Sequence, residues 1–294
     1  MFWKCTAMIE ILGAAIALAG TATVAYTDFR TGYMPDRYTH SMIVLGALML
    51  PFYSGFEAAL PHYGIALAVF AASFVFYTFG QLGGGDVKLF TGLALLVPAY
   101  PLSLGAIGLS PVPAPYPFVV SVFFASAVLA MAFVSAGYLL RLYSDRKRVK
   151  GFRKKAFRGL AYSAFTLPLA AIWLVLSPKM LLVALPLAAG AFVLSFKEDI
   201  LKLYVVKKKA VKDLNDDDVI ALELIGASTK KKLGIGSRKT FLEMELKGLK
   251  KNARKHGIKN VLVQEYLPRF GPFILASLLL NLLVGDTLLW LLFA

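Results

Sequence analysis

Long apolar segments with few charges alternate with short polar stretches along this chain. About 18 or more such residues can cross the ~30 Å hydrocarbon core of a bilayer as one helix. The pattern predicts an all-α polytopic membrane protein with about eight transmembrane helices. The predicted spans are residues 11–27, 38–53, 62–79, 87–107, 118–143, 160–176, 180–196 and 273–293.

Two parts of this pattern allow alternatives. The first apolar run follows Lys4 and also fits a cleavable signal peptide, but the Asp28 at its end and the heavier positive charge after later segments favour a retained span. Pro98 and Pro101 can end the fourth span early, which would change the number of spans by one.

Charge distribution predicts the orientation. If the amino terminus is outside, every Lys and Arg except Lys4 and Lys179 falls on the cytoplasmic side, as the positive-inside rule requires. The net charge of +15 is then explained without a nucleic-acid partner, and membrane lipid with anionic head groups is the expected partner of the remaining basic surface. With 58% apolar residues and a mean hydropathy of +0.68, the composition excludes an ordinary soluble domain.

A long polar segment interrupts the apolar pattern before the last span. We expect residues 1–196 to form a membrane domain of about seven helices, 197–268 a basic cytoplasmic insert, and 269–294 the final transmembrane helix. Within the insert, Asp216 is a candidate N-cap for a helix over Val219–Ile225, and Gly257 ends a second helix over 240–255. A strand is expected near 261–266, so the insert is predicted to be small and α+β.

Two carboxylates stand out at the boundaries of the apolar segments. Asp86 follows three glycines, Gly83, Gly84 and Gly85, which lack a Cβ and therefore let another group approach closely. By the predicted topology Asp28 lies at the same cytoplasmic level, and two acids in close contact share one proton, as acid and base chemistry requires. The alternative is that each is an ordinary helix-end residue, with Asp86 capping the helix that follows.

No other group of residues competes with this pair. The single Cys5 excludes an intrachain disulfide and a cysteine zinc cluster, and the three histidines fall on both sides of the membrane. We therefore expect no metal and no cofactor. The run 234–240 is rich in glycine but lacks the spacing of a phosphate-binding loop, and Asp286 is expected to be a packing or outer-face residue.

The two acidic segments resemble the two signatures of the GxGD aspartic peptidases that process type IV prepilins and archaeal preflagellins. The first signature is Asp28 followed by Met34-Pro35-Asp36, with Met where Ile is usual, and the second is Gly83-Gly84-Gly85-Asp86-Val87-Lys88. The resemblance covers the first four predicted spans. Residues 267–273 are also similar to the carboxyl-terminal part of archaeal members, whereas the middle, about 110–260, shows no match.

This resemblance implies roles for the matching positions. Asp28 and Asp86 would be the catalytic pair, and Gly83 and Gly85, with Gly84 between them, would form a tight loop. Pro35, Asp36 and Lys88 match the motifs without a catalytic role. Bacterial relatives carry a cytoplasmic zinc domain with paired CxxC motifs and also methylate their product, whereas this chain resembles the archaeal, peptidase-only branch, for which no methyl donor is expected.

The implied activity is a membrane-embedded aspartic endopeptidase. Its substrates would be prepilin-like or preflagellin precursors with class III signal peptides, cut at the cytoplasmic face between a short basic leader and an apolar helix. Two alternatives use the same acids differently. An intramembrane protease of the presenilin or signal-peptide-peptidase kind would need a Pro-Ala-Leu stretch, which is absent. A non-enzymatic proton-coupled transporter would place its acids at the membrane midplane, between inverted repeats.

Overall fold

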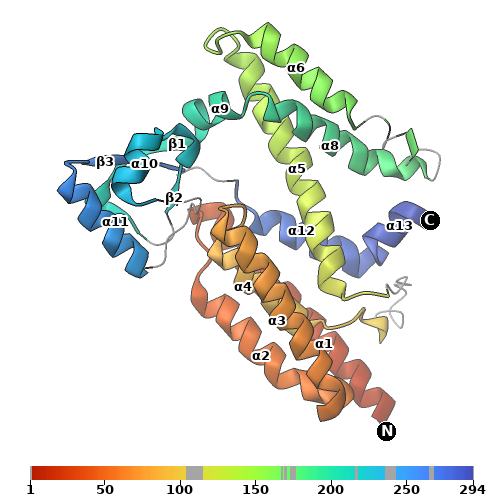
Figure 1. Cartoon of the computed structure of the whole chain (residues 1–294). Coiled ribbons are helices and arrows are strands. Elements are labelled where there is room, and N and C mark those ends of the chain that lie inside the picture. The colour runs from red at the N-terminus through yellow and green to blue at the C-terminus, as the bar shows by residue number, and fades with distance from the viewer. Residues whose placement is uncertain are drawn as a thin grey trace.

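The computed structural model describes residues 2–103, 115–166, 168, 171–172, 177–215, 218–235, 243–264 and 268–293 (Figure 1). Most of these residues are helical. The main helices are α1 Phe2–Thr31, α2 Asp36–Ser54, α3 Phe56–Thr78, α4 Gly84–Leu96, α5 Phe118–Ser144, α6 Phe152–Ala164, α8 Leu181–Leu194, α9 Lys197–Ile200, α10 Ala227–Leu233, α11 Glu243–Lys255, α12 Gly271–Val284 and α13 Thr287–Phe293.

Several helices have the length and composition of membrane spans. In the described part of the chain these are Ala7–Thr31, Ala59–Thr78 and Phe118–Ser144, and the pair Pro178–Leu194 and Lys197–Val205, bent by 76°, makes a fourth if it is one span. Large apolar side chains such as Leu67 point outward from these helices. Extensive exposed apolar surface of this kind indicates a membrane protein. The predicted number of about eight spans is not confirmed.

The fourth predicted span, 87–107, is shorter than expected. Helix α4 ends at Leu96, just before Pro98, whose ring cannot continue a helix. The sixth predicted span, 160–176, begins inside α6, which ends at Ala164, and most of its remainder lies outside the described residues.

The last predicted span, 273–293, is broken into α12 and α13. Gly285, between them, has φ +100°, a conformation that side chains other than glycine rarely adopt. The next residue, Asp286, accepts a hydrogen bond from the N–H of Leu289 at 2.8 Å and so caps the start of α13. A single apolar run in the sequence therefore forms two helices.

Helix α4 lies at the centre of the larger hydrophobic core. It is buried along most of its length and packs against α1, α2, α3 and α5 (Figure 1). Phe90 is fully buried, with its ring edge-on to Phe123 of α5. A Cβ on Gly46 of α2 would lie only 2.7 Å from the Cβ of Leu95, so this glycine permits the close packing of α2 on α4.

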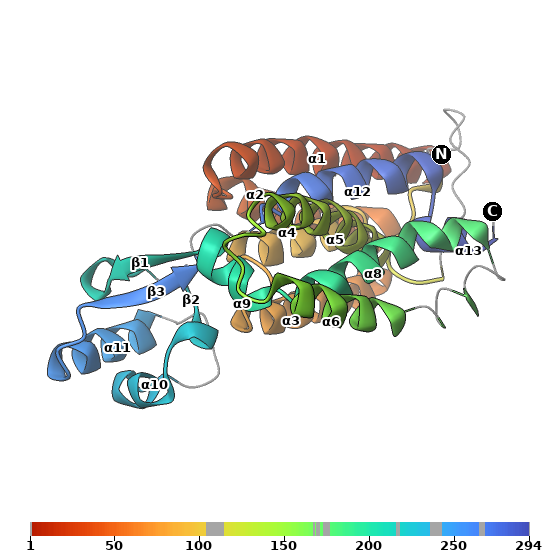
Figure 2. The ribbon, with the colours of Figure 1, turned by 90° about the horizontal axis from the view of Figure 1, so that it is seen from above.

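Figure 2 shows a small sheet with α10 and α11 projecting from one end of the long helices. Its strands β1 Val206–Ala210, β2 Val219–Ile220 and β3 Asn260–Gln264 are antiparallel in the order β1-β3-β2. Residues of the sheet and of α10 and α11, among them Ile220, Leu233 and Leu249, form a buried cluster of their own. The division of the chain at residues 196 and 268 stays a prediction.

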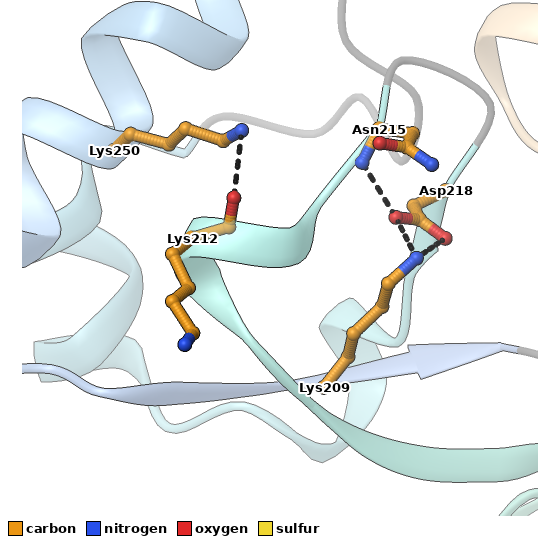
Figure 3. A network of polar contacts seen from close by, with 5 residues as sticks. All are labelled: Lys209, Lys212, Asn215, Asp218 and Lys250. Carbon is orange, nitrogen blue, oxygen red and sulfur yellow. Dashed lines mark hydrogen bonds and ion pairs between the residues drawn. The ribbon is translucent and has the colours of Figure 1, made fainter.

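Polar contacts fix the loops around this sheet (Figure 3). The ammonium of Lys209 on β1 contacts both carboxylate oxygens of Asp218, at 2.9 and 2.7 Å, and Asp218 also accepts a bond from the N–H of Asn215. Lys250 of α11 donates to the carbonyl of Lys212 at 3.2 Å. These contacts join α11 and the segment before β2 to the end of β1.

One of the elements expected here was wrong. Val219–Ile225 is not a helix, because Val219 and Ile220 pair with Gln264 and Val263 of β3, and a short 3-10 turn, Leu222–Leu224, follows. The expected N-cap Asp216 and most of the 234–240 run lie outside the described residues. The helix expected over 240–255 and the strand near 261–266 are confirmed in their described parts by α11 and β3.

Candidate functional site

The two carboxylates singled out by the sequence are both buried at helix ends. Asp28 lies in the last turn of α1 and Asp86 in the first turn of α4, and each side chain belongs to a residue only 5% exposed. The two lie within electrostatic range of each other. The fold thus brings together two acids that are 58 positions apart in the sequence.

Asp86 is held by its own helix. Its Oδ2 accepts a hydrogen bond from the backbone N–H of Gly83, the residue before α4, at 2.9 Å. Asp86 is therefore not the N-cap that the simpler interpretation expected: it lies inside the helix and bonds back to the N-cap residue. Its Oδ1 is buried and has no hydrogen-bond partner among the described residues. An unpartnered buried oxygen is costly, so capping does not account for the whole side chain.

Asp28 is held by a helix from the far end of the chain. Its Oδ2 accepts a hydrogen bond from the backbone N–H of Gly271, the first residue of α12, at 2.9 Å. The guanidinium of Arg269 lies within electrostatic range of Asp28 and donates to the carbonyl of Phe29. The sequence alone assigned no role to Arg269 or Gly271. The feature that could have identified Gly271 is the Gly-Pro pair, which is typical of a helix start, where backbone N–H groups lack partners.

Met34 fills the space beside both helix starts. It is 8% exposed, and its Cβ would be 2.6 Å from a Cβ on Gly85 of α4. Its Cε would be 3.1 Å from a Cβ on Gly271 of α12. Glycine at 85 is therefore required for the approach of α4 to the base of this side chain, and glycine at 271 leaves space for its flexible end beside α12.

The other motif residues join α2 to α4. Pro35 precedes the first residue of α2, Asp36, whose Oδ1 lies 2.6 Å from the ammonium of Lys88. The side chains of Lys88 and Asp36 are 30% and 50% exposed, so this ion pair adds little stability by itself. The ion pair joins the first residue of α2 to the beginning of α4, two residues after Asp86.

Burial gives the carboxyl group of Asp86 an unusually high pKa. Its pKa is raised to about 7, chiefly because burial desolvates the carboxylate; the hydrogen bond from Gly83 acts to lower this pKa, and the nearby charge of Asp28 acts to raise it. Asp86 lies outside the candidate membrane spans. A carboxyl group with such a pKa is about half protonated at neutral pH, so it can either donate a proton to a bound group or accept one.

Other candidate sites have ordinary explanations. In the described ranges no three His, Cys, Asp or Glu side chains come together in a way that could hold a metal ion. The buried Asp286 accepts hydrogen bonds from Tyr116 at 2.7 Å and from Ser121 in addition to capping α13. Because its oxygens are occupied in this way, Asp286 fits the packing role expected of it.

Comparison with known proteins finds similarity over the segment that carries both acids. Residues 15–135 match the type IV leader peptidase family, a segment that contains Asp28, Asp86 and all of the motif residues around them. Arg269 and Gly271 lie outside it. No solved structure matches the chain at a significant level.

Two curated archaeal proteins are similar to part of the chain. The prepilin peptidase EppA of Methanothermobacter thermautotrophicus is 31% identical over 153 residues, which are 48% of this chain and 39% of that protein. The prepilin peptidase EppA of Methanocaldococcus jannaschii is 35% identical over 79 residues, 27% of this chain and 21% of that protein. The chain therefore spans less than half the length of each of these relatives.

Two neighbouring glycines provide a matched test of the packing around Met34. Gly85→Ala should lower the thermal unfolding midpoint in detergent, because its Cβ would overlap Met34 and overpacking costs about 1–3 kcal/mol. Gly84→Ala is the control, since its Cβ would stand 3.6 Å from Tyr77, an ordinary contact. Equal midpoints for the two variants would contradict the close approach described here.

The raised pKa of Asp86 predicts a pH dependence of stability. A protonated Asp86 contributes stability that is fully present below the unfolded pKa of 3.8 and is lost as the pH rises through about 7. Between about pH 5 and about pH 8 the wild type should therefore lose more thermal stability than Asp86→Asn, which cannot ionise. Parallel pH dependences of the two unfolding midpoints would show that Asp86 has an ordinary pKa.

Proposed function

We propose that this protein is a membrane-embedded aspartic endopeptidase that cleaves prepilin-like or preflagellin precursors, because residues 15–135 match the type IV leader peptidase family. The observation that carries the proposal is the pair of buried carboxylates, Asp28 and Asp86, each with one oxygen held by a backbone N–H. The names of the archaeal relatives, both prepilin peptidases, support the substrate class.

The surroundings of the two acids suggest different roles. Asp86 has a pKa of about 7 and an Oδ1 with no partner among the residues described above, so it carries the shared proton and polarises the scissile carbonyl through a hydrogen bond. Asp28 is the ionised member and accepts a proton from a water molecule between the two side chains. The water oxygen then attacks the carbonyl carbon, and the amide nitrogen leaves after receiving the proton held by Asp28. No covalent enzyme intermediate forms.

The two parts of the proposed substrate would occupy different environments. We place its apolar helix against the outward apolar faces of the long helices and its short basic leader at the aqueous edge, where Asp28 and Asp86 lie at helix ends. Cleavage at the cytoplasmic face follows from the positive-inside distribution of Lys and Arg. The products are the free leader peptide and a mature protein that begins at its apolar helix.

Replacing either acid should abolish cleavage. Asp28→Asn and Asp86→Asn each remove one proton-handling group, so a precursor incubated with either variant in detergent or proteoliposomes should show no leader-sized shift on a gel. Asp145→Asn, which alters a carboxylate at the end of α5, should cleave like the wild type. Near-normal turnover by Asp28→Asn or Asp86→Asn would exclude the shared-proton mechanism. Loss of proton transport without any effect on cleavage would favour a transporter.

The proposed cytoplasmic face has its own test. Reporter tags inserted within 145–155 and within 230–239 should be accessible only from the cytoplasm, and a tag within 112–115 only from outside, because of the basic residues near the first two positions. Accessibility can be measured by labelling intact cells and inverted membrane vesicles. An external tag at 230–239 would overturn the assigned orientation.

A further inference from the structure

The segment that leads into α12 makes two hydrogen bonds to the end of α1. Gly271, the first residue of α12, donates its N–H to Oδ2 of Asp28 at 2.9 Å, and this bond is buried. The first N–H groups of a helix have no partner within the helix, and here a carboxylate side chain supplies one. The bond fixes Oδ2 of Asp28, and Oδ1 takes no part in it.

The second bond comes from Arg269, two residues earlier. Its guanidinium donates to the backbone carbonyl of Phe29, the residue after Asp28. The last carbonyl groups of a helix likewise lack intrahelical partners, and a cation is favoured at that end. Arg269 therefore holds the backbone of the turn that carries Asp28, whereas Gly271 holds the side chain.

The packing around Gly271 is tight, so any larger residue there would require its neighbours to shift. A Cβ on Gly271 would lie 3.0 Å from Oδ2 of Asp28, 3.1 Å from Cε of Met34 and 3.2 Å from Cα of Ala25. The 3.2 Å approach is to backbone, which cannot rotate away as a side chain can. A side chain at 271 would thus press on the carboxylate oxygen that accepts the 2.9 Å bond and on the backbone beside it.

We propose that Arg269 and Gly271 are positioning residues for Asp28, fixing its backbone turn and one carboxylate oxygen so that the other oxygen faces the substrate water. This inference rests on the proposed function, in which Asp28 is catalytic. Because both residues bond to the end of α1 that carries Asp28, we expect them to affect the rate of the chemical step more than precursor binding. A misplacement of a catalytic group by about 1 Å can cost roughly a hundredfold in rate.

Substitutions at Arg269 separate positioning from simple structural support. Arg269→Gln should lower kcat for precursor cleavage roughly tenfold to a hundredfold and change KM by less than about twofold. Arg269→Lys keeps a cationic donor and should recover part of kcat. Arg30→Gln is the matched control, because this exposed arginine at the same end of α1 lies over the ring of Tyr26. It should retain the wild-type kcat.

A second readout does not depend on cleavage. The rate at which a water-soluble carbodiimide modifies Asp28, measured by mass spectrometry on the membrane-embedded protein, should rise in Arg269→Gln and in Gly271→Ala but not in Arg30→Gln. Faster modification together with a wild type that cleaves no precursor would refute the proposed function and leave the positioning role supported. The positioning role would be overturned if Arg269→Gln had the kcat of the wild type and the same rate of Asp28 modification. It would also be overturned if Arg269→Lys and Arg269→Gln lost kcat equally and a fall in thermal stability explained both losses.

Discussion

Two backbone N–H groups, those of Gly83 and Gly271, make it possible for this protein to bury two carboxylates next to each other. An unpaired charge in a protein interior costs several kcal/mol, and a hydrogen bond from a backbone donor offsets part of that cost. Each donor serves one oxygen of one acid, at 2.9 Å. Because the donors belong to the starts of α4 and α12, the site forms only when α1, α4 and α12 are packed together.

The two acids are alike in burial but not in surroundings. Asp86 is held from within its own helix and keeps a buried oxygen that has no partner in the part of the chain that the structure describes, and its pKa is raised to about 7. Asp28 is held across a helix interface and lies within electrostatic range of Arg269. A pair of acids whose environments differ in this way can divide the roles of proton donor and proton acceptor, which is what the proposed hydrolysis requires.

Close approach of helices is the second constraint on the site. In a membrane, water does not drive helices together, so small residues that let backbones approach contribute much of the packing. Gly85 and Gly271 meet the same methionine, Met34, from two helices. The methionine, with a flexible side chain, fills the irregular space between them. Met34 thus packs between the starts of α4 and α12, the two helix starts whose backbone N–H groups hold the carboxylates.

The sequence by itself determined the helical membrane class, the two acids and the glycines before Asp86, because apolar length, isolated charges and glycine runs are local features that side chains reveal. It did not reveal Gly271 as a partner of Asp28, since a backbone N–H has no signature of its own and the two residues are 243 positions apart. Tertiary structure also decided that Val219 and Ile220 form a strand, because β3 supplies their pairing partner from more than 40 residues later in the chain. It likewise broke the last apolar run at Gly285, where Asp286 finds Tyr116 and Ser121 as partners on another segment. In each case the deciding interaction joins residues that are distant in sequence, and only the packed chain brings them within hydrogen-bonding distance.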